Sequence, residues 1–274
     1  MFEFHRDKAR YFEMQRRTAA EYIVPRVLGQ WARPRPWRVL EVGCAEAGVL
    51  KAFADLGHEV VGVELETHRA ALAREFLAGE IAAGRASIRT DDVYDVTAED
   101  LGGAFDVVVL KDVIEHLPDQ ARMVPRLRGF LRAGGVLFFG FPPWHMPFGG
   151  HQQIAASKRV TRAPWLHLLP AGAYGRYLRA AGESDHIVAE LEGIRATGIS
   201  VERFEQIVRD SGLVVLDREL WFFNPIYAYK FGLRALALPS ALAAIPGARN
   251  LYTTAAYYVV GRRAARPSPD PSPA

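Results

Sequence analysis

The chain has only one cysteine, Cys44, among its 274 residues. A single cysteine excludes an intrachain disulfide and a zinc site built from several thiolates. The sequence has no uninterrupted apolar stretch long enough to span a bilayer, and its first residues lack the apolar run of a signal peptide. We therefore expect a cytoplasmic protein with no stable membrane insertion.

A strong excess of one charge is also missing. The 34 Lys and Arg residues nearly balance the 31 Asp and Glu residues, which leaves a net charge of +3. No concentrated basic patch is visible beyond the Arg-rich N-terminal stretch, so we expect no nucleic-acid partner. Half of the residues are hydrophobic, which is typical of a globular chain with one large domain or a domain carrying an insertion.

Strand and helix patterns alternate through the first half of the chain. Helical patterns separate most of the apolar, β-branched runs, and this alternation predicts a parallel sheet covered by helices on both faces. A later strand and a final antiparallel partner complete the pattern. The predicted strands are 38–42, 59–65, 86–89, 105–110, 136–140, 213–223 and 252–262.

The same pass along the chain predicts five parts. They are an N-terminal helical cap at 1–36 that Pro25 kinks or divides, a core at 37–141, a proline-rich lid insertion for the substrate at 142–198, the rest of the core at 199–265 with an insertion at 224–251, and a disordered tail at 266–274. The apolar segment 231–245 is expected to be a helix on the lid or a partner subunit, in preference to a stretch that touches a membrane.

Residues suited to ligand binding follow the predicted strands, at the edge where open parallel sheets bind ligands. Glu41 ends the first strand, and the loop from Gly43 to Gly48 lets the backbone approach a ligand closely. Glu64 ends the second strand, where its carboxylate can accept hydrogen bonds from both hydroxyls of a ribose. Asp92 follows the third strand and can accept from an adenine amino group.

This arrangement is compatible with two cofactors. A glycine loop followed by an acid about 20 residues later is also typical of a dinucleotide fold, so an NAD-dependent oxidoreductase is one alternative. Glu41 argues against it, because a carboxylate repels phosphate and suits an ammonium group, and the loop lacks a second glycine beside the pyrophosphate. A ligand with a ribose, an adenine and a cationic amino-acid part, but no phosphate, is S-adenosylmethionine.

Five motifs in order carry a family resemblance. Val39–Gly48, Val61–Glu64, Asp91–Val93, Phe105–Leu117 and Leu131–Leu137 together resemble class I S-adenosylmethionine-dependent methyltransferases, and most of all the small-molecule group with a generic methyltransferase domain. The resemblance covers residues 37–141 well and the last two strands more loosely.

The resemblance implies an α/β fold, with a Rossmann-like, doubly wound sheet of seven strands whose last strand is antiparallel, plus a helical cap and lid. The sequence departs from the family pattern at Ala45 and Ala47, where glycines are usual. A strained backbone at Ala45 would cost about 1 kcal/mol or more. The implied cofactor residues are Glu41, Gly43, Cys44, Ala45, Gly48, Glu64, Leu65, Asp92, Val93, Lys111 and Asp112.

Transfer of the methyl group requires alignment of the acceptor and, where the acceptor carries a proton, a base. His116, His145 and His151 are the candidate catalytic residues, each with a structural role as the alternative. Two histidines without a nearby carboxylate make a poor metal site, so no metal is expected. The residues predicted to line an apolar substrate pocket are Trp144, Phe148 and Tyr174.

The function predicted from these residues is methyl transfer to a small organic acceptor, with oxygen preferred as the methylated atom. The alternatives are N- or C-methylation of a natural product or a sugar or glycan precursor, and a non-catalytic methyltransferase-like binding subunit. A homodimer is a further expectation for the assembly.

Overall fold

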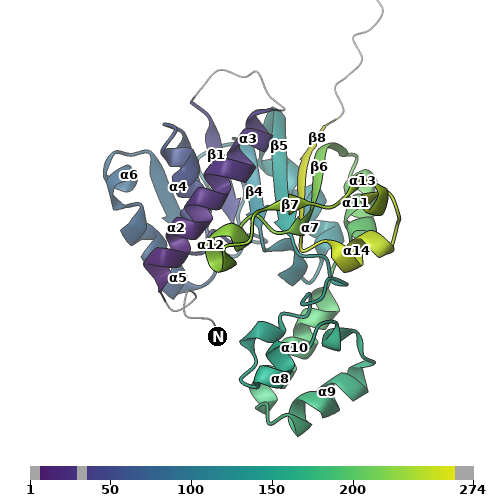
Figure 1. Cartoon of the computed structure of the whole chain (residues 1–274). Coiled ribbons are helices and arrows are strands. Elements are labelled where there is room, and N and C mark those ends of the chain that lie inside the picture. The colour runs from purple at the N-terminus through teal and green to yellow at the C-terminus, as the bar shows by residue number, and fades with distance from the viewer. Residues whose placement is uncertain (1–6, 30–35, 263–274) are drawn as a thin grey trace, which may run out of the picture.

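One mixed sheet of eight strands forms the centre of the computed structural model, which describes residues 7–29 and 36–262 (Figure 1). The strand order is β3-β2-β1-β4-β5-β8-β6-β7. The first five strands pair in parallel, and β8 runs antiparallel to both β5 and β6. The strands are β1 Arg38–Val42, β2 Glu59–Val63, β3 Ala86–Arg89, β4 Phe105–Lys111, β5 Leu131–Phe141, β6 Val214–Phe223, β7 Leu236–Ala237 and β8 Ala255–Gly261.

The Rossmann-like fold with an antiparallel last strand is therefore confirmed, but the count of seven strands is wrong. The additional strand is β7, which has two residues and pairs Ala237 with Trp221 at the edge of the sheet. Two residues show no hydrophobic alternation, so no sequence pattern could reveal this strand.

The central strands are buried on both faces. Every residue of β1, β4 and β8 is buried, as expected for strands covered on both sides. One face packs against α7 (Gln120–Leu127) and α11 (Val201–Asp210), and the other against the N-terminal helices and α4 (Gly48–Ala54). Ser200 caps the N-terminus of α11, because its side chain accepts a hydrogen bond from the Arg203 backbone N–H.

The helix that follows β2 is interrupted. Residues 67–82 form two helices, α5 (Thr67–Phe76) and α6 (Ala78–Ala82). Leu77 lies between them with non-helical backbone angles, and its fully buried side chain fixes the break against the core.

The N-terminal cap lies across α4. It consists of α2 (Lys8–Thr18), a π-helical turn (Ala19–Ile23) and α3 (Val24–Leu28), and its residues 1–6 and 30–35 lie outside the described part. Pro25 has no N–H to donate to the helix. The π turn lies directly before α3, so Pro25 divides the regular α-helical pattern, as predicted. The contact with α4 is close: a Cβ at Gly48 would lie 2.6 Å from the Phe12 carbonyl oxygen.

Residues 142–198 form a separate lobe beyond the carboxyl ends of the parallel strands (Figure 1). The lobe has its own apolar core, which includes Val160, Tyr174, Leu178, Val188 and Leu191. Its elements are the 3₁₀ turns Gln152–Ile154 and Leu166–Leu168 and the helices α8 Lys158–Thr161, α9 Ala171–Ala180 and α10 Asp185–Thr197.

The segment after β6 differs from its predicted helix. It contains α12 (Tyr227–Phe231), β7, α13 (Ser240–Ala243) and α14 (Ala248–Tyr252). A continuous helix over 231–245 is ruled out by Gly232, which adopts a left-handed angle, and by Pro239. None of the described helices is long and apolar enough to cross a membrane, and the tail at 266–274 lies outside the described residues.

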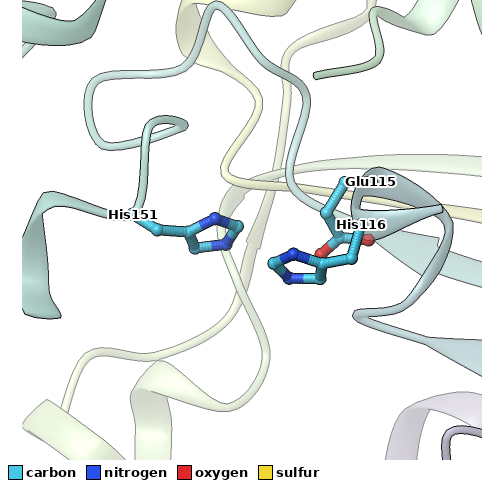
Figure 2. Close-up of side chains that lie close together, drawn as sticks. All are labelled: Glu115, His116 and His151. Atoms are coloured by element: carbon cyan, nitrogen blue, oxygen red, sulfur yellow. The ribbon is translucent and has the colours of Figure 1, made fainter. Parts of the chain in front are cut away.

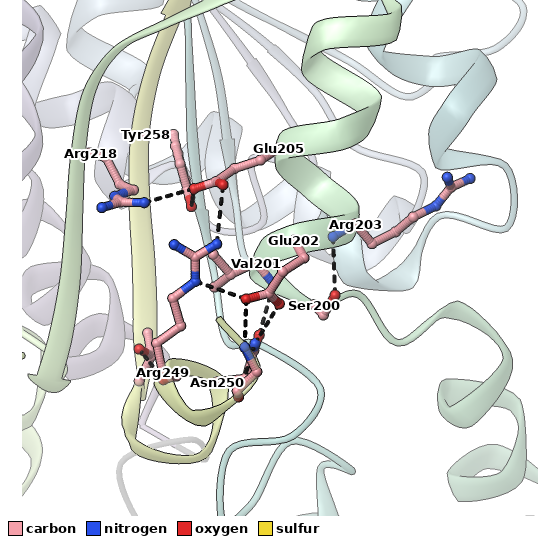
Figure 3. A network of polar contacts seen from close by, with 11 residues as sticks. Ser200, Val201, Glu202, Arg203, Glu205, Arg218, Arg249, Asn250 and Tyr258 are labelled. Atoms are coloured by element: carbon pink, nitrogen blue, oxygen red, sulfur yellow. Dashed lines mark hydrogen bonds and ion pairs between the residues drawn. The ribbon is translucent and has the colours of Figure 1, made fainter. Parts of the chain in front are cut away.

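A polar network anchors α14 to α11 (Figure 3). The Glu202 carboxylate accepts hydrogen bonds from Arg249 Nε at 2.8 Å, Asn250 Nδ2 at 2.6 Å and the Gly247 N–H at 3.0 Å. Arg249 also contacts Glu205 at 3.1 Å. Burial would raise the pKa of Glu202, but these donors outweigh it and lower the pKa from 4.5 to about 2.

We expect Glu202→Gln to lower the free energy of unfolding by about 1–2 kcal/mol at neutral pH, a modest value because the side chain is 36% exposed. A folded-state pKa below the unfolded value stabilises the protein above about pH 4.5, and that stabilisation is lost as the pH falls toward 2. Urea unfolding at several pH values should therefore show the difference from wild type shrinking below pH 4.5. Asp210→Asn, at the exposed end of the same helix, is the matched control and should change little.

Candidate active site

The loop after β1 is tied to the end of β2. The backbone N–H groups of Gly43 and Cys44 both donate to the Val63 carbonyl, at 2.8 and 3.2 Å. The Ala45 N–H donates to Glu64 Oε2 at 2.8 Å. Gly43 has a left-handed φ of +67°, and a Cβ there would lie 2.5 Å from Val113. Only glycine therefore fits at this point of the loop.

Ala45 and Ala47 adopt the backbone angles of the glycines that they replace. Their φ angles are +50° and +64°, in the left-handed region. An L-residue in this region costs about 1–2 kcal/mol. The left-handed angle of Ala45 confirms the strain expected at this residue. Ala47 has the same kind of strained angle at the start of α4.

Glu41 faces a small pocket beside this loop. Its side chain is buried, and Oε2 has no hydrogen-bond partner among the described residues. Burial raises its pKa well above the ordinary value, while a hydrogen bond that the carboxylate accepts from the Leu50 backbone opposes the rise. The pocket is roofed by α2. It is lined by Phe12, Gln15, Glu41, Gly43, Cys44, Ala45, Glu46, Gly48, Val49 and Lys111. An unpartnered carboxyl oxygen in such a pocket suits a cationic ammonium group.

Glu64 is placed by two backbone groups. Its Oε2 accepts from Ala45 and its Oε1 from the Glu66 N–H at 2.9 Å, so the carboxylate is held at the mouth of the loop. Each oxygen keeps further acceptor capacity for a ribose hydroxyl. Leu65, beside it, is 69% exposed and offers an apolar surface at the same edge.

Asp92 and Val93 follow β3, as predicted. Asp92 Oδ1 accepts from the Tyr94 N–H at 2.8 Å, and the Val93 carbonyl accepts from Arg126 Nε at 3.1 Å. These bonds fix the turn, and binding of an adenine by this turn stays a prediction.

Lys111 and Asp112, at the end of β4, form an ion pair of 2.5 Å between Nζ and Oδ2. Lys111 is buried; burial would lower its pKa, but the Asp112 carboxylate outweighs burial and raises it. Asp112 has a left-handed φ of +57°, and its N–H donates to the Gly140 carbonyl at 2.7 Å. The sequence suggested only a backbone role for these two residues, so the ion pair is a new feature.

Sequence reasoning missed Tyr11 of α2 and Lys230 of α12, which lie around this pair. Burial first, and then the Asp112 charge, raise the pKa of Tyr11 to about 12. Lys230 lies over the Tyr11 ring at 5.1 Å, and burial lowers its pKa to about 8. Tyr227 also contributes to the surroundings of Asp112. No spacing rule links residues so far apart in the chain, so only the fold could bring them together.

Two of the three candidate histidines lie together. The rings of His116 and His151 stack with centroids 4.9 Å apart and an interplanar angle of 21° (Figure 2). His116 ends the 3₁₀ turn Ile114–His116, and His151 lies on the loop after β5. His145 is exposed and lies near His167 at the base of the lobe, so it is not part of the pair.

A carboxylate does lie beside this pair, contrary to the expectation from the sequence. The ligand atoms of Glu115, His116 and His151 are all within 4.8 Å of one another. Glu115 belongs to the same tight turn as His116, and the turn directs its carboxylate inward toward the loop that carries His151 (Figure 2). The premise on which a metal was rejected is therefore wrong.

The predicted substrate aromatics have different surroundings. The Trp144 ring packs edge-on against His167 at 4.6 Å, and Phe148 is 39% exposed. Tyr174 is completely buried in the core of the lobe. This burial contradicts its predicted role in lining an acceptor pocket, because the helical spacing that aligns Tyr174 with Leu178 turns both inward.

Comparisons with known proteins agree with this geometry. A family profile described as "Methyltransferase domain" matches residues 11–183. Over 216 residues, the chain is 27% identical to ubiquinone biosynthesis O-methyltransferase from Sinorhizobium fredii, with 75% of this chain and 74% of that protein aligned.

Two solved structures share the fold at low sequence identity. One is the plantazolicin methyltransferase BpumL in complex with a triazolic desmethylPZN analog and S-adenosylhomocysteine (TM-score 0.56, 10% identity, 95% of this chain and 88% of that chain). The other is magnesium protoporphyrin IX methyltransferase from Synechocystis PCC 6803 with bound S-adenosylmethionine (TM-score 0.52, 14% identity, 96% and 86%).

We expect Ala45→Gly to raise the free energy of unfolding by about 1 kcal/mol, because glycine removes the left-handed strain at a half-buried position. Denaturant unfolding of the cofactor-free protein measures the change. Ala71→Gly, on the exposed face of α5, is the matched control and should lower stability by about 1 kcal/mol. Equal losses for both variants would contradict strain at Ala45.

Proposed function

The chain belongs to the class I S-adenosylmethionine-dependent methyltransferases, and from this premise we propose that it methylates a hydroxyl oxygen of a small organic acceptor. The observation that carries the proposal is the position of the His116–His151 pair. Asp112 contributes to the electrostatic surroundings of both histidines, and it directly follows Lys111, which lines the Glu41 pocket. The pair therefore borders the side of the cofactor edge where an acceptor would approach.

The residues of the edge fit the cofactor. When bound, S-adenosylmethionine supplies a methyl group on a sulfonium that is already activated for transfer. We assign Glu41 to the ammonium group, because its buried Oε2 lacks a partner among the described residues. Glu64 would hold the ribose, and Asp92 with Val93 the adenine. The backbone of the Gly43–Gly48 loop would lie along the methionine part.

The acceptor side combines aromatic and cationic side chains. Tyr11 and Tyr227 supply aromatic surfaces, and Lys230 supplies a cation near Asp112. These groups suit a planar organic molecule that carries hydroxyl or anionic substituents. A hydroxyl acceptor must lose its proton during transfer, and His116 and His151 lie where that loss would occur. The relative named as an O-methyltransferase also favours oxygen over nitrogen or carbon.

The same proposal covers the partners. We expect no nucleic-acid substrate, and we propose a cytoplasmic enzyme whose one cysteine, Cys44, is a buried free thiol. A homodimer is compatible with the exposed apolar side chains of Phe231, Leu236 and Ile245. The non-catalytic alternative is disfavoured because a buried Glu41, whose Oε2 has no partner among the described residues, and a histidine pair border the same edge.

We expect Glu64→Gln to weaken S-adenosylmethionine binding by about tenfold or more, because a charged acceptor contributes roughly 1.5–3 kcal/mol per hydrogen bond. Isothermal titration calorimetry measures the affinity. Glu66→Gln changes a neighbouring acid whose side chain makes no hydrogen bond described here, and it should bind as wild type does. Equal affinities for all three proteins would show that the ribose lies elsewhere.

Transfer to oxygen is tested with labelled S-adenosylmethionine and a panel of planar acceptors. Each hydroxylated compound is paired with its amine analogue and with the compound whose hydroxyl is already methylated. We expect label only in the hydroxylated members, because the proton leaves from oxygen at the histidine pair. Label in the amine analogues alone would overturn O-methylation while leaving the methyltransferase assignment intact.

A further inference from the structure

We propose that Glu115, His116 and His151 bind one divalent transition-metal ion, for which Zn²⁺ is the representative, on the acceptor side of the cofactor edge. The inference rests on the proposed function, because the ion would bind and activate the acceptor hydroxyl. In this proposal the three side chains act together as metal ligands, and neither histidine acts alone as a base.

The three side chains converge from two separate parts of the chain. Glu115 and His116 come from the 3₁₀ turn after β4, and His151 comes from the loop after β5 (Figure 2). Their possible ligand atoms are at most 4.8 Å apart. Tetrahedral ligands at about 2.1 Å from Zn²⁺ lie roughly 3.4 Å apart. His116 lies at the exposed side of the cluster, so a small movement of its side chain would bring the ligand atoms to this spacing.

The cluster is left unsatisfied by the protein itself. Glu115 is only 3% exposed, and neither of its carboxylate oxygens has a hydrogen-bond partner among the described residues. His151 Nδ1 is also buried without a partner there. A buried polar group without a hydrogen bond is energetically unfavourable, so such groups normally find partners. A cation between the three side chains would satisfy all of them together.

The backbone supports the same arrangement. His151 has a left-handed φ of +54°, an angle that a side chain other than glycine adopts at a cost. This angle is what turns the imidazole toward His116. Strain that holds a ligand in place is common at functional sites.

The ligand set suits an open, catalytic metal site. Two imidazoles and one carboxylate leave at least one position for an exchangeable ligand, and neutral imidazole is a good ligand for Zn²⁺. An acceptor hydroxyl bound there would lose its proton to solvent at neutral pH, because the metal stabilises the oxyanion. The carbon–oxygen bond then forms as the carbon–sulfur bond breaks, and the electron pair of that bond stays on sulfur. The step is redox-neutral and needs no further reactant.

The test uses the untagged, full-length protein after treatment with a chelator. Calorimetry with Zn²⁺ should show one site, and Co²⁺ should give the visible absorption of a nitrogen- and oxygen-bound ion. We expect Glu115→Gln and His151→Ala each to weaken Zn²⁺ binding at least tenfold. His145→Ala, on the same loop but outside the cluster, is the matched control and should bind as wild type does.

A thermal readout keeps the test independent of activity. Zn²⁺ should raise the unfolding temperature of wild type but not that of Glu115→Gln. The metal-free Glu115→Gln protein should be at least as stable as metal-free wild type, since the unpaired buried carboxyl is gone. Binding of S-adenosylmethionine should be unchanged in this variant, which shows that the fold and cofactor site persist. The metal site would be overturned if wild type bound no stoichiometric Zn²⁺, or if all variants bound it equally. Failure of wild type to bind S-adenosylmethionine would instead refute the proposed function.

Discussion

The candidate site depends on the hydrogen bonds that fasten the loop after β1 to the end of β2. Two N–H groups of the loop donate to the Val63 carbonyl, and the next N–H donates to Glu64. Because β1 and β2 are neighbouring parallel strands in register, their carboxyl ends meet, and a loop leaving one strand can bond to the other. This contact places Glu41 and Glu64 on either side of one loop, and it fixes where a cofactor with both an ammonium group and a ribose would lie.

The edge is costly to form. Ala45, Ala47, Asp112 and His151 hold left-handed backbone angles, and Lys111 is buried. Glu41 and Glu115 are buried with oxygens that lack partners among the described residues. The rest of the sheet offsets these costs with apolar strands covered on both faces. Strain and unsatisfied polar atoms therefore gather at the carboxyl edge, where ligands would satisfy them.

The lobe 142–198 and the N-terminal cap lie beside this edge in different directions. The lobe 142–198 has a separate apolar core, so it forms a unit beyond the strand ends (Figure 1). The cap packs directly on α4, and Lys8 pairs with Glu46 of the loop at 2.7 Å. Glu46 also pairs with Arg69 of α5 at 3.3 Å, so one buried carboxylate links the cap, the loop and the helix after β2. A movement of the cap away from the loop would break this partly buried Lys8–Glu46 pair.

The sequence by itself determined the parallel part of the sheet, the edge at which Glu41, Glu64 and Asp92 lie, and the family. Strand periodicity is local, and the side chains that follow parallel strands must meet at one edge, so Glu41, Glu64 and Asp92 could be placed without coordinates. The bounds of β3 were also predicted correctly, because four residues between clear turn signals leave little choice. Only the tertiary structure decided how the acceptor side is built. A tight 3₁₀ turn directs Glu115 toward the loop that carries His151, which lies much later in the chain, and packing of α2 and α12 brings Tyr11 beside Lys230. Such contacts depend on the packing of distant segments, which leaves no periodic signal in the sequence.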